Sequence, residues 1–528
     1  MLEVRLQHGV RVAEGAWPLR RICSFPVALC AVLAITIFAL ARNGLADPDI
    51  WWHLRNADYM LREHTWLRAD MYSYTVFGRP WMDHEWLAEI PYYLAWRAFG
   101  LAGIKALSLL ILATVFGALL YLCQRKSRNI KASAIACSLA VFLGSVSFGP
   151  RTILFGYGFL VLLLLLLERF RRRGDAPLWL LPILFCVWVN THGSWFLGLI
   201  VLLIYIGCGL KDIRWGNVEA ARWSTPQLRR LSVAAAASIA AVFVNPYGYR
   251  LVLYPLDMAF HQKLNISHVA EWSSVDFHDV RGKVALIFLL AMLLGALLSK
   301  HTWQLHEVGL VLFGTYAALT YVRFLFLAGI LAAPVIANFL SSIPDYKPEI
   351  DRPFLNALLI AAAMAFVIVG FPTESQLRQS VAREYPADIL SYLEAAPPSG
   401  RILNYYLWGG YLGWMAPSIK DFVDSRVDVF ESAGIFRDYL DLLELKNPAA
   451  ILEKYHVRYV LFPPSEPLSY ALQHDPEWKV VFAGDVSILF EKVVGEKPSA
   501  SSAQVESGVP AGGERLFLRE RPDLGTRQ

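Results

Sequence analysis

The sequence predicts an α-helical polytopic membrane protein with a small α/β domain near its C-terminus. The 528 residues are 56% hydrophobic and only 18% charged, with a mean hydropathy of +0.42. A soluble chain of this length carries about a quarter charged residues. The apolar residues also form continuous runs of membrane-spanning length instead of a spaced amphipathic pattern. These observations exclude a single water-soluble domain.

Apolar segments long enough, or nearly so, to cross roughly 30 Å of hydrocarbon predict about 11 transmembrane helices. They lie at 22–42, 102–122, 132–149, 153–168, 178–190, 195–210, 231–245, 283–299, 304–322, 324–341 and 354–371. Two of them, 178–190 and 195–210, are short, and a single hairpin that dips into the membrane is the alternative.

Lysine and arginine predict the orientation, because basic loops resist translocation. Basic clusters at 125–131, 169–173 and 211–230 alternate with loops that hold isolated cations such as Arg151 and Arg323. This bias predicts a cytoplasmic N-terminus and, after an odd number of spans, an extracytoplasmic C-terminal domain. The net charge of +5 is small and most basic residues lie on one side, which argues against a nucleic-acid partner.

The topology predicts a cytoplasmic N-terminus, a transmembrane domain with a long first outer loop, an extracytoplasmic α/β domain and a disordered tail. The respective ranges are 1–21, 22–371 with the loop at 43–101, 372–495, and 496–528. Within the outer domain, strand patterns begin at Arg401, Asp421, Val457 and Lys479, and helical patterns lie at 435–445 and 448–455. The tail is rich in Ser, Gly, Pro and charge, which is typical of disorder.

The first outer loop contains two clusters of candidate catalytic residues. Asp47 and Asp49 flank a proline, and His53 follows one helical turn later. The second cluster consists of Asp83, His84 and Glu85. Carboxylates and imidazoles serve as general bases, and Asp47 and Asp49 are also candidate ligands of Mg²⁺ or Mn²⁺. For Asp47, the alternative is a plain helix cap.

The same loop is rich in tryptophan, a residue that suits the membrane interface because it combines an apolar ring with one N–H donor. Its tryptophans are Trp51, Trp52, Trp66, Trp81 and Trp86. We therefore expect the loop to lie in the interface.

Further polar residues occur at the ends of apolar segments on the same predicted side of the membrane. They are Arg151, Asn190, His192, Glu271 and Arg323. Polar groups at membrane depth are costly unless they are partnered, so these residues are candidates for substrate binding. The alternative for Asn190 and His192 is the capping of helix ends.

The outer domain contains two motifs suited to a glycan. Trp408 and Tyr411 lie in Trp-Gly-Gly-Tyr-Leu, and Asp-Ser-Arg-Val-Asp begins at Asp424. Aromatic faces stack on sugar rings, and Asp and Arg bind hydroxyl groups. The alternative is structural, with Gly409 and Gly410 permitting a tight turn and the aromatic rings forming core.

On these residues the sequence resembles the GT-C superfamily of membrane glycosyltransferases, which move a sugar from a polyprenyl-phosphate carrier on the outer side of the membrane. It most resembles an uncharacterised bacterial branch, through the patterns at 47–54, 81–87, 190–193 and 408–412. It lacks the Trp-Trp-Asp-Tyr-Gly motif of oligosaccharyltransferases, so glycosylation of peptide sequons is not expected.

The resemblance implies a GT-C-like enzyme of the bacterial inner membrane. Its donor would be a polyprenyl-phosphate-linked sugar, and its acceptor an envelope glycan, lipid or protein. Asp47 or Asp49 would deprotonate the acceptor or bind a divalent cation, while Arg151 and Arg323 would bind the carrier phosphate.

Two other functions remain open. A membrane-bound O-acyltransferase would use His192 with Asn190 nearby. A transporter would show internal repeats with broken helices at mid-membrane, and the sequence shows no convincing repeat.

Overall fold

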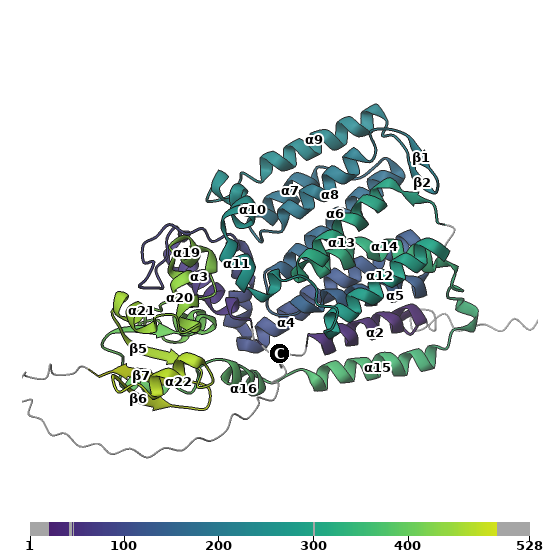
Figure 1. Cartoon of the computed structure of the whole chain (residues 1–528). Coiled ribbons are helices and arrows are strands. Elements are labelled where there is room, and N and C mark those ends of the chain that lie inside the picture. The colour runs from purple at the N-terminus through teal and green to yellow at the C-terminus, as the bar shows by residue number, and fades with distance from the viewer. Residues whose placement is uncertain (1–20, 42–44, 46, 299–300, 494–528) are drawn as a thin grey trace, which may run out of the picture.

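The computed structural model describes residues 21–41, 45, 47–298 and 301–493. A helical bundle occupies most of it, and a smaller domain built from the C-terminal residues packs at one end of this bundle (Figure 1). The predicted disordered tail at 496–528 and nearly all of the N-terminal segment 1–21 lie outside the described residues.

Each predicted apolar segment overlaps a helix. The helices are α2 (Phe25–Leu40), α4 (Trp86–Ser127), α5 (Ile130–Gly144), α6 (Ile153–Arg173), α7 (Leu180–Val189), α8 (Trp195–Gly207), α9 (Thr225–Ala241), α12 (Val280–Leu298), α13 (Leu305–Thr320), α14 (Leu325–Phe339) and α15 (Pro353–Gly370). In the described part of the chain, six helical stretches, containing α4, α5, α6, α12, α14 and α15, are long and apolar enough to cross a membrane. Helices α2, α7, α8 and α13 are apolar but shorter. The polytopic helical fold is therefore confirmed, while the number of spans stays a prediction.

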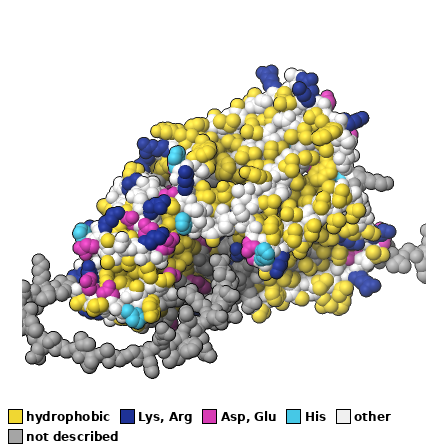
Figure 2. Space-filling view, viewed as in Figure 1, with side chains coloured by type: hydrophobic (Ala, Val, Ile, Leu, Met, Phe, Trp, Pro, Cys, Tyr) yellow, Lys and Arg dark blue, Asp and Glu magenta, His cyan; other side chains and the backbone are white. Residues whose placement is uncertain are grey.

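Helix α14 forms the centre of the bundle. It packs against α4, α5 and α13, and almost all of its side chains from Leu325 to Phe339 are buried. A helix that is hydrophobic on every face needs such an enclosed position. In contrast, α12 and α15 expose large apolar side chains such as Leu297 and Val369. Figure 2 shows the resulting apolar surface of the bundle, with charged side chains mostly toward its ends, as expected for a surface that faces lipid.

Helix α4 contains a sharp break at Phe99 and Gly100, where Gly100 has a φ of 62°. This positive φ favours glycine because other residues pay a steric cost there. The Glu374 carboxylate of α16 (Glu374–Glu384) accepts a hydrogen bond from the Ala102 backbone N–H at 3.1 Å, just after the break. The break therefore separates an outer portion of α4 from its long apolar portion.

The C-terminal domain contains a four-stranded sheet in the order β4 (Arg401–Asn404), β5 (Val457–Phe462), β7 (Ile488–Lys492) and β6 (Trp478–Ala483). Strands β4 and β5 are parallel, and the other pairs are antiparallel. Its helices after α16 are α17 (Leu390–Ala395), α18 (Gly409–Met415), α19 (Val427–Ser432), α20 (Ile435–Leu443), α21 (Pro448–Lys454) and α22 (Pro467–Gln473). The small α/β composition agrees with the prediction, although the pattern at 488–492 was not recognised as a strand.

One strand prediction is wrong, because residues 421–426 belong to no sheet strand. Their backbone is bonded elsewhere: Asp421 exchanges hydrogen bonds with Tyr72 and Tyr74 of the first outer loop. The Asn404 side chain also bonds the backbone of Phe422 and Val423. This segment therefore joins the C-terminal domain to the first outer loop.

The described part of the first outer loop packs against the C-terminal domain. It contains α3 (Asp49–Glu63), which packs against α18. Trp51, Trp52 and Trp81 are buried, with at most 5% of each side chain exposed. The expected interfacial position is thus wrong for these three tryptophans, because they pack inside protein instead of lipid.

Two short helices, α10 (Tyr249–His261) and α11 (Lys263–His268), also lie toward the C-terminal domain, and α11 contacts α19. A small sheet of β1 (Ile213–Trp215), β2 (Val218–Ala220) and β3 (Trp303–Gln304) forms elsewhere. Figure 1 shows β1 and β2 at the end of the bundle remote from the C-terminal domain.

Candidate active site

A small cavity lies at the end of the bundle that carries the C-terminal domain. Its volume is about 60 Å³, enough for a few water molecules. It is lined by Asp47, Asp49, His53, Glu85, Ser147, Arg151, Thr152, Ile153, His192, Glu271 and Arg323. Eight of these side chains were singled out from the sequence, and folding brings them together from five separate segments.

Arg151 is the central cation of the cavity. It forms ion pairs with both Asp47 and Glu271. Burial alone would lower the pKa of Arg151, but these two carboxylates outweigh it and raise the pKa. Conversely, burial opposes the charge on Glu271, while Arg151 and Arg323 hold its pKa below the usual value. Arg151 is therefore protonated, and its positive charge is balanced by the carboxylates of Asp47 and Glu271.

Asp47 has a second role at the start of α3. Its Oδ1 accepts a hydrogen bond from the backbone N–H of Asp49 at 3.0 Å, which satisfies one of the free N–H groups at the helix start. The capping interpretation and the placement in the cavity thus both hold for Asp47.

Asp49 has different surroundings. Its Oδ1 accepts a hydrogen bond from the Trp52 indole N–H at 3.1 Å. Burial and the neighbouring charge of Asp47 raise the pKa of Asp49 to about 8, although Ser425 and Arg151 act in the opposite direction. A carboxyl group with this pKa exchanges its proton near neutral pH, as a general base requires.

Glu85 lies among three histidines. Its carboxylate oxygens are 3.4 Å from His53 Nε2, 3.3 Å from His192 Nε2 and 3.5 Å from His84 Nε2. Burial raises the pKa of Glu85 to about 8 and lowers the pKa of His53 and His192 well below the usual value. The Ser194 backbone N–H donates to His192 Nδ1 at 3.0 Å. A neutral His192 therefore carries its proton on Nε2, facing Glu85.

Arg323 is the second cation of the cavity. Its guanidinium stacks over the Trp272 ring at 4.2 Å, and it forms no ion pair with a described residue. Its charge is therefore less neutralised than that of Arg151, which leaves Arg323 better suited to an anionic ligand.

Three predicted residues support the site without lining the cavity. Asp83 is buried and accepts a hydrogen bond from Asn56 at 3.2 Å. His84 stacks on Tyr254, with ring centroids 4.5 Å apart. Asn190 accepts a bond from Trp86 and donates to the backbone carbonyls of Cys186 and Val244. Its amide therefore joins the end of α7 to the start of α4 and to the segment after α9, which is the structural role given as the alternative.

Trp408 and Tyr411 also lie outside this cavity. Trp408 lines a larger cavity of about 440 Å³, together with Pro48, Tyr385 and Tyr405. Tyr411 packs against Trp51 and Tyr385 in the domain core, so the structural interpretation holds for it. Since Pro48 separates Asp47 from Asp49, the two cavities meet at the same turn of the chain.

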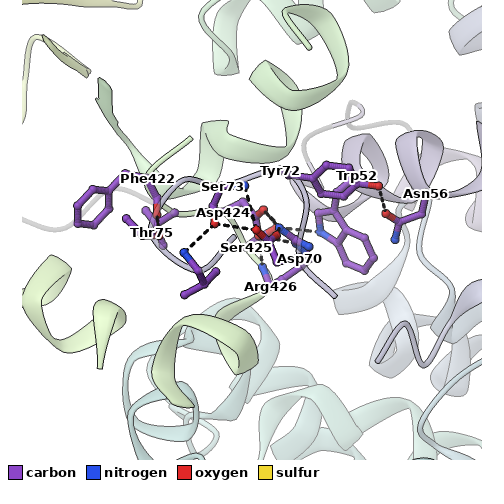
Figure 3. Close-up of polar contacts among 12 residues, drawn as sticks. Trp52, Asn56, Asp70, Tyr72, Ser73, Thr75, Phe422, Asp424, Ser425 and Arg426 are labelled. Atoms are coloured by element: carbon purple, nitrogen blue, oxygen red, sulfur yellow. Dashed lines mark hydrogen bonds and ion pairs between the residues drawn. The ribbon is translucent and has the colours of Figure 1, made fainter. Parts of the chain in front are cut away.

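Several residues at the site were not predicted. Glu89 lies 2.8 Å from His53 Nδ1, and the Trp52 indole N–H also donates to the Ser425 hydroxyl at 3.1 Å. The sequence predicts the Asp-Ser-Arg motif at 424–426 as a candidate glycan-binding site. Instead, Arg426 pairs with Asp70 and Asp424 inside the protein (Figure 3).

The carboxylates do not form a ready cation site. Both oxygens of Asp47 are already bonded, one by Arg151 and one by the Asp49 N–H. Among the described residues, no group of three His, Cys, Asp or Glu side chains is arranged to hold a metal ion. The donor set thus does not fit the Mg²⁺ or Mn²⁺ considered from the sequence, and the mechanism below uses protein side chains.

No protein-family model matches the chain, and no curated protein matches its sequence. Solved structures that are similar over most of its length include the following two. ArnT from Cupriavidus metallidurans, bound to undecaprenyl phosphate, is 11% identical, with 91% of this chain and 99% of ArnT covered and a TM-score of 0.52. The archaeal oligosaccharyltransferase AglB from Archaeoglobus fulgidus, in complex with an inhibitory peptide and a dolichol-phosphate, is 12% identical, with coverages of 90% and 75% and a TM-score of 0.48.

Identity this low shows a common fold and not a common activity. ArnT is covered almost completely and therefore shares the fold of this chain from end to end. This chain has the GT-C fold, as the sequence resemblance implied.

Proposed function

We propose that this protein is a membrane glycosyltransferase that moves a sugar from a polyprenyl-phosphate carrier to an envelope acceptor. One observation carries the proposal: Asp49 and Arg323 line the same cavity. Asp49 is a carboxyl group with a pKa raised to about 8, and Arg323 forms no ion pair with a described residue, although its charge lowers the pKa of Glu271. Sugar transfer from a lipid phosphate needs a base for the acceptor and a cation for the departing phosphate.

In the proposed reaction, the acceptor hydroxyl oxygen forms a bond to the anomeric carbon of the donor sugar. The bond between that carbon and the phosphate oxygen breaks, and its electron pair leaves with the carrier phosphate. The hydroxyl proton passes to Asp49, and the Arg323 guanidinium stabilises the charge on the phosphate. Asp47 and Glu271 hold Arg151 in place beside these groups.

The position of the cavity supports this reaction. A lipid carrier stays in the bilayer, whereas a polar acceptor arrives from water, so the reacting groups must meet at the membrane surface. The cavity lies between the first outer loop, which contributes Asp49 and Glu85, and the ends of the bundle segments, which contribute residues such as Arg151. The fold shared with ArnT, which was solved with undecaprenyl phosphate bound, supports a polyprenyl phosphate as the carrier.

The C-terminal domain offers a place for the acceptor. Its cavity of about 440 Å³ has aromatic walls at Tyr405 and Trp408 and polar groups at Arg383 and Asp485. Aromatic faces and charged groups together suit an envelope glycan, lipid or protein. We place this domain outside the bacterial inner membrane and the N-terminus in the cytoplasm, following the distribution of basic loops.

The O-acyltransferase alternative is less well supported. It would use Asn190 close to His192, but the Asn190 amide is engaged with Trp86 and two backbone carbonyls. His192 instead faces Glu85.

The test measures transfer of labelled sugar from a mixture of polyprenyl-phosphate donors to envelope fractions, with membranes containing equal amounts of each variant. Asp49→Asn keeps the size of the side chain and removes the base. Asp58→Asn is the matched control, because Asp58 lies on the same helix outside the cavity. We expect transfer to fall about 100- to 10,000-fold in Asp49→Asn and to stay normal in Asp58→Asn.

Unchanged transfer in Asp49→Asn would contradict the role of Asp49. If wild-type membranes neither transfer sugar nor bind a polyprenyl phosphate, the proposed function itself is wrong.

A further inference from the structure

A third cavity lies at the other end of the bundle, between the C-terminal ends of α4 and α6. Its volume is about 330 Å³, and its rim carries Arg125, Arg169, Arg172 and Arg173. Its wall, on the bundle side of the rim, includes Leu122, Leu165 and Leu166. We propose that this cavity binds the headgroup of an anionic glycerophospholipid, with the acyl chains against the leucine wall.

The length of helix α6 indicates how deep this cavity lies in the membrane. Ile153, at the start of α6, lines the candidate active site, whereas Arg173, at its end, lines the basic cavity. A helix of 21 residues is about 30 Å long, which equals the thickness of the hydrocarbon core. The arginines therefore lie at the headgroup level of the opposite leaflet, whichever way the protein is inserted.

The charges around the cavity leave it positive. Arg172 pairs with Glu168 at 3.5 Å, and Arg169 pairs with Asp175 at 3.5 Å. Arg125 and Arg173 pair with no carboxylate among the described residues. Glu168 is itself shared with Lys126, 3.6 Å away. Two guanidinium groups thus remain for an anion, and they bind phosphate through paired donors.

The layering of the cavity indicates a lipid in preference to a soluble anion. The leucines lie one to two helical turns before the arginines on α6, so the apolar wall lies on the hydrocarbon side of the charged rim. This order matches a glycerophospholipid, whose charged headgroup lies outside its chains. Basic residues that only determine orientation need no such cavity.

The experiment uses the purified full-length protein in neutral detergent, titrated with phosphatidylglycerol or phosphatidylcholine while the unfolding temperature is followed by tryptophan fluorescence. We expect phosphatidylglycerol, and not phosphatidylcholine, to raise this temperature. In Arg125→Gln/Arg173→Gln, the concentration for a half-maximal effect should rise about 30-fold, because each arginine contributes about fivefold to binding an anionic lipid.

Arg214→Gln/Arg229→Gln is the matched control, since it removes the same charge outside the cavity and should titrate like wild type. Equal responses of the two double variants, an equal effect of phosphatidylcholine, or an equal effect of inorganic phosphate would overturn the proposal.

A second measurement needs only the wild-type protein. Phosphatidylglycerol with a photoreactive acyl chain should label the segments 121–126 and 165–173, and unlabelled phosphatidylglycerol should compete. Labelling confined to other segments would contradict the proposed site.

Discussion

The Arg426 guanidinium lies 2.6 Å from the Asp70 carboxylate, and both side chains are at most 1% exposed, although 356 residues separate them in sequence. Arg426 also bonds Asp424 and stacks over Tyr72 and Trp81. This cluster joins the first outer loop to the C-terminal domain (Figure 3). The two parts of the candidate site are therefore held together by one buried ion pair and its neighbours.

Arg426→Met should weaken the attachment of the C-terminal domain. The substitution leaves Asp70 and Asp424 buried without their cation, which typically costs about 3–5 kcal/mol. We expect a lower unfolding temperature and faster proteolysis of the C-terminal domain. Arg437→Met, at an exposed position of the same domain, serves as the control, and equal behaviour of the two variants would contradict the structural role of Arg426.

The transfer rate should depend on pH through Asp49. The base must be deprotonated, and burial together with Asp47 raises the pKa of Asp49 to about 8. The rate should therefore rise as the pH increases toward about 8 and level off above it. Rates at saturating donor, measured from pH 6 to 9.5, check this expectation. A rate independent of pH over this range would show that another group accepts the proton.

Ser425→Ala tests the contribution of the C-terminal domain to the base. The Ser425 hydroxyl lowers the pKa of Asp49, so its removal should move the rising limb of the pH profile to higher pH. A loss that is merely structural would lower the rate equally at every pH. Ser432→Ala, on α19 of the same domain, should leave the profile in place.

Arg323→Gln and Arg151→Gln should differ. Removing Arg323 deletes the cation proposed for the carrier phosphate and should weaken undecaprenyl phosphate binding about 10- to 100-fold with little change in stability. Removing Arg151 leaves Asp47 and Glu271 without their partner and should lower the unfolding temperature. Lipid binding by native mass spectrometry and thermal unfolding separate the two effects. Normal lipid binding by Arg323→Gln would rule out its phosphate role.

Gly409→Ala should destabilise the docking of α18. A Cβ at this position would lie 2.3 Å from the Val423 carbonyl oxygen, which leaves no room for a methyl group. We expect about 1–3 kcal/mol of lost stability, seen as a lower unfolding temperature. The cause differs at Gly434. A Cβ added there would meet no atom within 4 Å, but the φ of 79° is one that residues other than glycine rarely adopt. If Gly409→Ala unfolds like wild type, the close approach is not required.

The polytopic helical architecture follows from sequence alone, because a long apolar run has few stable states other than a buried or lipid-facing helix. The start of α3 could also be predicted from the sequence, because Asp and Pro are strongly preferred at the first positions of helices. The polar residues at the ends of apolar segments could also be expected to share one face, because alternate ends of successive spans lie on the same side. Four of them, Arg151, His192, Glu271 and Arg323, indeed line one cavity, together with four residues of the first outer loop.

Only the tertiary structure decided which of these residues face one another. The spacing of the two aspartates along the chain did not show that their roles differ. Asp47 forms an ion pair with Arg151, whereas the pKa of Asp49 is raised. Nor did it reveal that Arg426 pairs with Asp70 in place of a ligand. Such pairings depend on contacts between segments hundreds of residues apart, whereas helix formation depends on neighbouring residues. For this reason the sequence determined the helices and the face of the site, and tertiary packing determined the charge and partner of each group within it.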